Sequence, residues 1–258
     1  MRLIVNADDF GWNVDTVQAT IDCFEAGVLT SATIMPSMPC ASAAIDYARL
    51  HPEFSFGVHL TFVRYDTERP SSEPERIPQL VDADGRFLPA PIVRFRALTG
   101  RLEPRQIEHE IAAQISPVLD AGIAVSHVDS HAHIHKFRPF REALKRVLPR
   151  FGIRRVRLAQ NLFCSFAPWR PTYWFGVRWG RLLRKSFATT EHFFMPGPAD
   201  GDWVARLLAH KLPGILEVGL HPGYDEAWRD RERRAALELV HRGSEQGWKL
   251  TNWFHVTG

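Results

Sequence analysis

The chain has 258 residues, 45% of them hydrophobic and 24% charged, which is the composition of a soluble globular protein with a sizeable core. The formal net charge is only +3, and three cysteines are too few for a disulfide framework. No stretch approaches the ~20 apolar residues of a transmembrane helix, and the N-terminal apolar run is too short for a signal peptide. We therefore expect a cytoplasmic protein, either free or peripheral at the inner face of the cytoplasmic membrane.

Apolar runs alternate with helical patterns along the chain. Strands are predicted at 2–7, 29–35, 54–60, 123–129, 153–158, 214–220 and 248–254. Helices are predicted at 14–27, 41–50, 104–120, 138–149, 172–186, 200–211 and 226–243. Residues 64–91, rich in Pro, Glu, Arg and Asp, predict a long loop that acts as a lid. The alternation favours a mostly parallel sheet, either open or closed into an α/β barrel.

Residues 143–190 contain no Asp or Glu but many Arg, Lys, Trp and Phe side chains. A basic, aromatic segment fits an anionic bilayer surface or an amphiphilic ligand. Nucleic acid is the competing interpretation. A solvated cationic face above ordinary core aromatics is equally compatible with the residues.

Polar side chains follow four of the predicted strands: Asp8 and Asp9, His59, the run at 127–135, and His221. Because strand ends converge on one site in α/β barrels, we expect these groups to meet in space. Taken singly, the aspartates could cap a helix, His59 could belong to the core, and His221 could open a turn. Together they predict an active site.

The run HVDSHAHIH holds four of the chain's twelve histidines, at 127, 131, 133 and 135, with Asp129 among them. This density predicts a metal site. An extended backbone would put all five on one face, whereas a helix would gather 127, 131 and 135. His131 lies on the favoured face in either case.

Asp and His side chains suit Zn²⁺, and also Mg²⁺, Mn²⁺, Co²⁺ or Ni²⁺, with positions left open for water and substrate. A metal bound in this way lowers the pKa of its water toward ~7. A second carboxylate can then accept the proton of the water, and an acid can protonate the leaving group. Adjacent aspartates can divide these tasks, since successive strand side chains point to opposite faces.

Four motifs in order, NADDFG (6–11), GVHL (57–60), HVDSHAHIH (127–135) and LHPGY (220–224), resemble the YdjC-like carbohydrate deacetylases, which include chitooligosaccharide deacetylase. The resemblance covers most of the chain. It implies an irregular (β/α) barrel of the glycoside hydrolase and deacetylase type. It also implies metal-dependent removal of an N-acetyl group by a single deacetylase domain over 1–258, with a basic aromatic insertion near 160–199.

Carried over by position, the resemblance implies three ligands for one divalent ion, Mg²⁺ or Zn²⁺: Asp9, His59 and His131. Asp8 resembles the catalytic base, and His221 resembles the acid. Many relatives carry histidine where this chain has Ala132, which puts contacts of the pocket in doubt but not the ligand before it. Asp129 is then expected beside the ligands or the substrate, and His127 in a structural role.

Within the family the chain looks most like the hopanoid-biosynthesis-associated HpnK branch, which implies a lipid-linked substrate, N-acetylglucosaminyl bacteriohopanetetrol. We expect substrate contacts from the following side chains: His133, His135, Trp169, Trp174 and Trp179. The expected partners are this N-acetylated sugar or glycolipid, a membrane surface and a second copy in a homodimer, with no nucleic acid.

Two other classes stay open. Metal-dependent phosphoesterases and amidohydrolases use a His-x-His pair like that of His133 and His135, but they usually place it on the first strand, which here ends in Asp-Asp. A non-catalytic sugar or lipid carrier with a structural metal is the third interpretation; a closed four-ligand site would support it.

Overall fold

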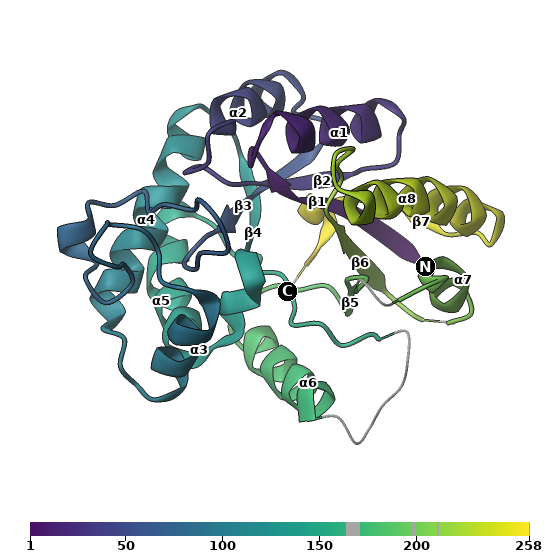
Figure 1. The fold of residues 1–258 in the computed structure, drawn as a ribbon. Coiled ribbons are helices and arrows are strands. Elements are labelled where there is room, and N and C mark those ends of the chain that lie inside the picture. The colour runs from purple at the N-terminus through teal and green to yellow at the C-terminus, as the bar shows by residue number, and fades with distance from the viewer. Residues whose placement is uncertain (164–170, 198–199, 211, 258) are drawn as a thin grey trace.

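The fold is known from a computed structural model, which describes residues 1–163, 171–197, 200–210 and 212–257. Its strands are β1 (Arg2–Phe10), β2 (Ser31–Ile34), β3 (Ser55–Leu60), β4 (Val125–Ser130), β5 (His192–Phe194), β6 (Ile215–Leu220) and β7 (Lys249–Leu250). Its helices are α1 (Val14–Glu25), α2 (Ala41–Leu50), α3 (Ala90–Leu98), α4 (Pro104–Asp120), α5 (Arg138–Val147), α6 (Pro171–Arg184), α7 (Trp203–Leu208) and α8 (Ala227–Glu245). Figure 1 shows the helices arranged around the strands.

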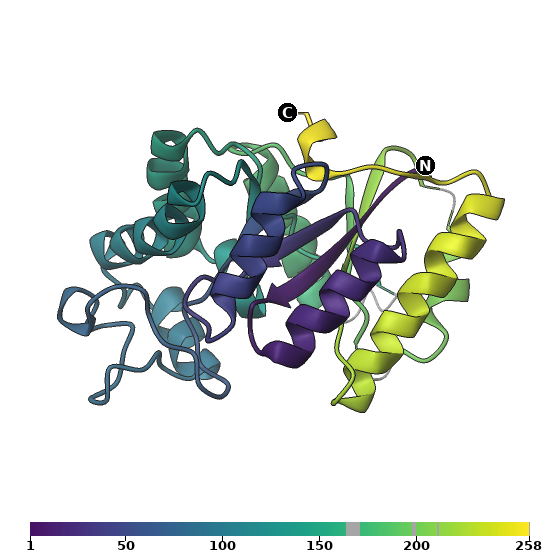
Figure 2. The ribbon, with the colours of Figure 1, turned by 90° about the horizontal axis from the view of Figure 1, so that it is seen from above.

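The strands form one parallel sheet in the order β4-β3-β2-β1-β6-β5, with β7 paired to β1. Every residue of β2, β3 and β6 is buried, as expected for parallel strands covered on both faces. Figure 2 shows α1, α2 and α8 along one side of the sheet. The carboxyl ends of all these strands therefore open at the same edge.

The gap between β4 and β5 is bridged by the segment 154–161. Val128 of β4 forms backbone hydrogen bonds of 3.0 Å with both Arg155 and Arg157, and Val156 donates to the carbonyl of Ala188 at 3.0 Å. The parallel sheet therefore curls toward closure without a continuous strand at this position. This confirms the expected irregular (β/α) barrel.

Several predicted elements differ from the structure. Residues 153–158 form only isolated bridges, and of 248–254 only Lys249 and Leu250 pair, because Asn252 caps a short 3₁₀ turn from Trp253. Neither α3 nor β5 was anticipated: α3 has little amphipathic periodicity, and β5 has three residues. Strands of only two or three residues, such as β7 and β5, are too short to show a hydrophobic periodicity in the sequence.

The predicted lid, residues 64–91, is anchored to the core rather than free. Ile77, Leu80 and Phe87 are fully buried, and a bridge joins Val81 to Phe87. Its action as a lid stays a prediction. No helix in the described part of the chain is long and apolar enough to cross a bilayer.

Candidate active site

Asp9 lies at the carboxyl end of β1 in an unusual backbone conformation. Its φ is +60°, in the left-handed region that aspartate tolerates better than most residues, and Trp12 N–H donates to its carbonyl at 3.0 Å. This turn directs the buried carboxylate toward the ends of β3 and β4. Asp9 Oδ1 lies 3.5 Å from His59 Nε2 and 3.3 Å from His131 Nδ1.

The three predicted metal ligands are therefore brought together from three separate segments. One ligand atom of each of Asp9, His59 and His131 lies within 4.8 Å of the others, and all three side chains are buried. Asp9 Oδ1, the oxygen that faces both rings, has no hydrogen-bond partner. A buried, unsatisfied carboxylate oxygen opposite two imidazole nitrogens is the donor set of a cation site.

A second group of possible ligands, Asp8, His59 and Asp129, shares His59 with the first. Here the carboxylates are already paired with a cation. Arg157 donates to both oxygens of Asp8, at 2.6 and 2.7 Å, and also forms ion pairs with Asp129 and with Glu217. The first group, with its unsatisfied oxygen, fits a metal better.

Each residue of the Asp9–His59–His131 group is held by a further charged side chain. Asp129 Oδ1 lies 2.8 Å from His59 Nδ1, and Arg229 Nη2 donates to Asp9 Oδ2 at 3.0 Å. Glu68 Oε1 lies 3.4 Å from His131 Nε2. Of these, the sequence singled out only Asp129. These contacts fix which atom of each presumed ligand faces the centre.

Beyond Ser130 the histidine run is no longer extended: His131–Lys136 forms 3₁₀ turns that are interrupted by a kink at Ala132 and His133. Ala132 and His133 have φ of +56° and +54°, so the chain turns sharply after His131 and separates the other histidines from it. His127 stacks on Trp253 with ring centroids 4.1 Å apart. The His127 ring packs so closely on β3 that residue 57 must be glycine, because a Cβ at Gly57 would lie 2.7 Å from the ring.

His133 and His135 lie beside the metal group rather than in it. Ser130 Oγ is 2.7 Å from His135 Nδ1, and the His133 ring meets Phe193 edge-on at 5.7 Å. Burial lowers the pKa of both imidazoles, that of His135 to about 3, so both are neutral. Their contact with substrate stays a prediction.

His221 follows β6 and is held by Glu232 of α8. Glu232 Oε2 accepts the backbone N–H of His221 at 2.8 Å and lies 3.1 Å from its Nδ1. Burial alone would lower the pKa of His221, but the Glu232 carboxylate outweighs burial and raises it. His221 is therefore disposed to carry a proton.

The carboxylates remain ionised despite their burial. Burial favours the neutral acid, but the Arg157 guanidinium outweighs it and holds the pKa of Asp8 below its usual range. For Asp9, His131 provides the largest opposing effect, and the pKa again falls well below its usual value. Reciprocally, Asp9 and Glu68 raise the pKa of His131 to about 9 against the effect of burial. The negative charge of these carboxylates therefore favours the binding of a cation at this site.

These side chains open into a cavity of about 480 Å³ at the carboxyl edge of the sheet. It is lined by Asp9, Trp12, Asn13, Tyr65, Asp66, His131, His221, Glu226, Trp228 and Arg229. The presumed ligands Asp9 and His131 thus share one space with the presumed acid, His221. The aromatic rings of this wall, Trp12, Tyr65 and Trp228, were not anticipated from the sequence.

Two of the three tryptophans expected to contact substrate lie elsewhere. Trp174 lines a separate hollow on α6, and Trp179 packs against Phe137 with ring centroids 5.3 Å apart. Trp169 lies outside the described residues. Neither Trp174 nor Trp179 is part of the described lining of the cavity, and their role in binding stays a prediction.

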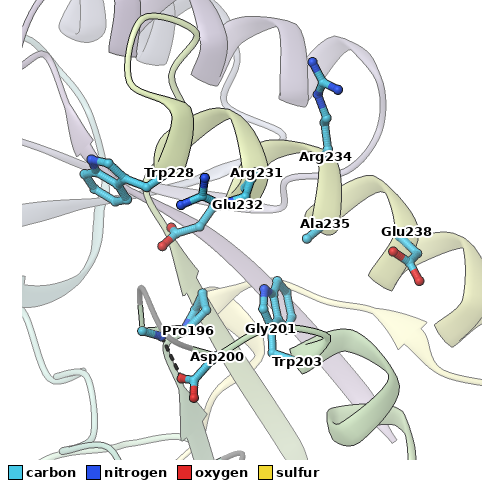
Figure 3. Close-up of a pocket in the computed structure, with 11 residues that line it drawn as sticks. Pro196, Asp200, Gly201, Trp203, Trp228, Arg231, Glu232, Arg234, Ala235 and Glu238 are labelled. Carbon is cyan, nitrogen blue, oxygen red and sulfur yellow. Dashed lines mark hydrogen bonds between the residues drawn. The ribbon is translucent and has the colours of Figure 1, made fainter.

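A second hollow of about 330 Å³ lies beside the first, between α8 and residues 196–197 and 200–203 (Figure 3). Trp228 lines both spaces, and Glu232, which holds His221, also lines the second. Figure 3 shows the Glu232 carboxylate pointing from α8 toward Pro196. Substitutions at Glu232 therefore affect both spaces.

The family model described as YdjC-like protein matches residues 2–248. The chain belongs to this family. Carbohydrate deacetylase from Thermoanaerobacter pseudethanolicus is 37% identical over 225 residues, 86% of this chain and 81% of that relative. Carbohydrate deacetylase from Geobacillus stearothermophilus is 35% identical over 159 residues, 61% of this chain and 60% of that relative.

Solved structures agree with this YdjC-like assignment in fold. An Enterococcus faecalis protein, named as a candidate cellobiose-phosphate cleavage protein, superposes with a TM-score of 0.78 and 23% identity over 98% of this chain and 97% of that one. The lactam utilization protein of Thermus thermophilus superposes with a TM-score of 0.54 and 13% identity over 97% of this chain and 99% of that one. At these identities the likeness concerns the fold alone.

Proposed function

We propose that this YdjC-like protein is a metal-dependent carbohydrate deacetylase that hydrolyses the N-acetyl amide of an amino sugar. The observation that carries the proposal is the convergence of Asp9, His59 and His131 in one ligand group, two of whose members, Asp9 and His131, line the same cavity as His221. Two relatives named carbohydrate deacetylase, at 37% and 35% identity, support the reaction class.

Asp9, His59 and His131 would hold one divalent ion, which the unsatisfied Asp9 Oδ1 fits. When bound, the ion supplies Lewis-acid chemistry: it acidifies a water and polarises the acetamide carbonyl. The ion is Mg²⁺ or Zn²⁺ in this proposal: the carboxylate suits either ion, and the two imidazoles suit Zn²⁺ better.

Asp8 is proposed as the proton acceptor and His221 as the donor. Asp8 is ionised, and one of its oxygens lies within 4.8 Å of a ring nitrogen of His59, next to the metal group. His221 lines the cavity, and the Glu232 carboxylate raises its pKa against the effect of burial, which favours the protonated imidazole. Asp8 would take a proton from the attacking water, and His221 would protonate the departing amine as acetate leaves.

The sugar is proposed to lie against the aromatic wall of the cavity. Trp12 and Tyr65 lie with ring centroids 5.5 and 5.3 Å from the ring of His131, and Trp228 lies 5.4 Å from His221. Planar aromatic side chains bury the apolar face of a sugar while its hydroxyls meet polar neighbours.

Within this function we propose a lipid-linked substrate, an N-acetylglucosaminyl group on bacteriohopanetetrol, read at a membrane surface. Helix α6 supports the surface contact, because Trp174 is 60% exposed and lines a hollow with Arg178, Arg181 and Lys185. Liposome co-sedimentation of Trp174→Ala tests it; unchanged binding and unchanged activity on lipid-linked substrate would argue against the contact.

The positions of His133 and His135 do not support the phosphoesterase or amidohydrolase alternative. In the described part of the chain, neither His133 nor His135 belongs to a group of three ligand-type side chains. Incubation of metal-loaded enzyme with N-acetylated sugars and with phosphate esters separates the classes. Mass spectrometry should show loss of one acetyl group from the sugars; phosphate release without acetate release would refute the deacetylase proposal.

A further inference from the structure

Glu68 is a fully buried carboxylate inside the long loop at 64–91. Its oxygens accept the backbone N–H of Tyr65 at 3.0 and 3.2 Å, and that of Asp66 at 2.8 Å. A buried carboxylate is stable only when such donors replace water. Glu68 therefore fixes the turn that places Tyr65 and Asp66 in the wall of the cavity.

The same carboxylate reaches the metal group. Glu68 Oε1 lies 3.4 Å from Nε2 of His131, whose other nitrogen, Nδ1, lies 3.3 Å from Asp9 Oδ1. A histidine that binds a metal through one nitrogen carries a proton on the other, and a carboxylate at that proton fixes the tautomer and orientation of the ring. Glu68 stands where such a carboxylate is needed.

We propose that Glu68 is a positioning residue that couples occupancy of the metal site to the order of the loop around Tyr65 and Asp66. The inference rests on the metal site of the proposed function. The Glu68 carboxylate lies 3.4 Å from His131 on one side and accepts two backbone N–H groups of the cavity wall on the other. Whatever Glu68 contributes to metal binding, the metal contributes equally to holding this turn, because coupling between two equilibria is reciprocal.

The coupling has a functional consequence. Tyr65 lies against the ring of His131, with centroids 5.3 Å apart, and 60% of its surface is exposed. The sugar-facing part of the loop would therefore reach its final order only when the metal is present. Sugar binding should then depend on the metal even where the sugar makes no contact with it.

Two variants and one control separate this role from a merely structural one. Glu68→Ala removes both sets of contacts, and Glu68→Gln keeps an acceptor oxygen without the charge. Glu75→Ala removes an exposed carboxylate from the same loop and serves as the matched control. Circular dichroism and thermal melting establish that each variant is folded before any comparison.

The first measurement is Zn²⁺ affinity by competition with a chromophoric chelator. Loss of a residue that orients a ligand weakens metal binding about 10- to 100-fold, so Glu68→Ala should fall in this range. Glu68→Gln should be intermediate, and Glu75→Ala should match the parent. At saturating Co²⁺ the visible spectrum of Glu68→Ala should equal that of the parent. A changed spectrum would make Glu68 a ligand and overturn the positioning role.

The second measurement is amide hydrogen exchange of residues 64–72 with and without Zn²⁺. Zn²⁺ should slow exchange in the parent and in Glu75→Ala, and have no effect in Glu68→Ala, although that variant exchanges faster in both states. If the parent and Glu68→Ala have equal Zn²⁺ affinity, or if Zn²⁺ protects both equally from exchange, the inference is overturned, but the proposed deacetylase activity is not affected.

If instead affinity and exchange change as expected but the parent releases no acetate from N-acetylated sugars, the inference is supported and the deacetylase proposal is refuted.

Discussion

Arg157 and Asp8 form a bidentate ion pair in the interior of the barrel, with N–O distances of 2.6 and 2.7 Å. Both side chains are almost fully buried. The two residues are 149 positions apart in the chain, so the pair spans the interior of the barrel from β1 to the irregular segment that bridges β4 and β5. It explains how two adjacent aspartates come to differ: Asp8 is neutralised by a fixed cation, whereas Asp9 keeps an unsatisfied oxygen.

Arg157→Met should therefore destabilise the fold strongly. The substitution leaves the negative charges of Asp8, Asp129 and Glu217 buried without their counter-ion, and breaking a buried pair in this way typically costs about 3–5 kcal/mol. Urea denaturation measures the change. The control is Arg155→Met, whose guanidinium donates to the backbone carbonyls of Val256 and Phe254 and pairs with no carboxylate of the described residues, so its loss should cost far less. Equal losses in the two variants would contradict a special role for the buried pair.

Asp8→Asn tests the assignment of the proton acceptor. Asparagine keeps the size of the side chain but cannot accept the proton of the water, so turnover should fall about 10²- to 10⁴-fold. Metal affinity should stay near that of the parent, since Asp8 is bound to Arg157 rather than to the Asp9–His59–His131 group. Acetate release from N-acetylated sugar and Zn²⁺ titration are the two measurements. Normal acetate release would exclude Asp8 as the base.

The three presumed metal ligands could be predicted from the sequence because each lies at or directly after the end of a predicted strand. Asp9 and His59 end buried apolar strands, and His131 directly follows one, so the topology of the barrel alone brings them together. Arg157 carries a weaker form of this signal, within the predicted strand at 153–158, and was not singled out.

Three charged residues that contact the presumed ligands or His221 could not be predicted in this way, because none of them follows a predicted strand. Glu68 lies in a loop, and Arg229 and Glu232 belong to an unbroken run of charged residues, 229–234, at the start of a helix. Nothing in their spacing distinguishes a buried charge from a solvated one. The sequence leaves the geometry of the histidine run open between an extended and a helical backbone, because positive φ at Ala132 and His133 breaks both periodic patterns and alanine gives no sign of it.

Glu232→Gln should change the pH dependence of the reaction. His221 acts as an acid only while protonated, and the Glu232 carboxylate raises its pKa against the effect of burial. Removing that charge lowers the pKa of His221, so the high-pH limb of the kcat/KM profile should move to lower pH while the low-pH limb stays. Glu238→Gln, an exposed residue on the same helix, is the control. An unshifted high-pH limb would mean that His221 is not the acid.

Trp12→Ala should weaken sugar binding more than turnover. Aromatic contacts contribute about 0.5–1.5 kcal/mol, so KM for a short N-acetylated sugar should rise about 2- to 12-fold with kcat little changed. Trp174→Ala, outside the described lining of the cavity, should leave KM for the same soluble sugar unchanged. If the Trp174 variant has the larger effect, the sugar binds near α6 and the proposed aromatic wall is wrong.

Removal of the metal should lower thermal stability through Asp9. A ligand present at a hundred times its Kd stabilises the folded state by about 2.7 kcal/mol, so a chelator should lower the Tm of the metal-loaded protein, and added Zn²⁺ should restore it. Asp9→Ala should lose this response, because it removes the unsatisfied oxygen that faces His59 and His131. Asp66→Ala removes a carboxylate from the same cavity but outside the metal group, and should keep the response. A Tm that responds to metal equally in Asp9→Ala and the parent would place the ion elsewhere in the protein.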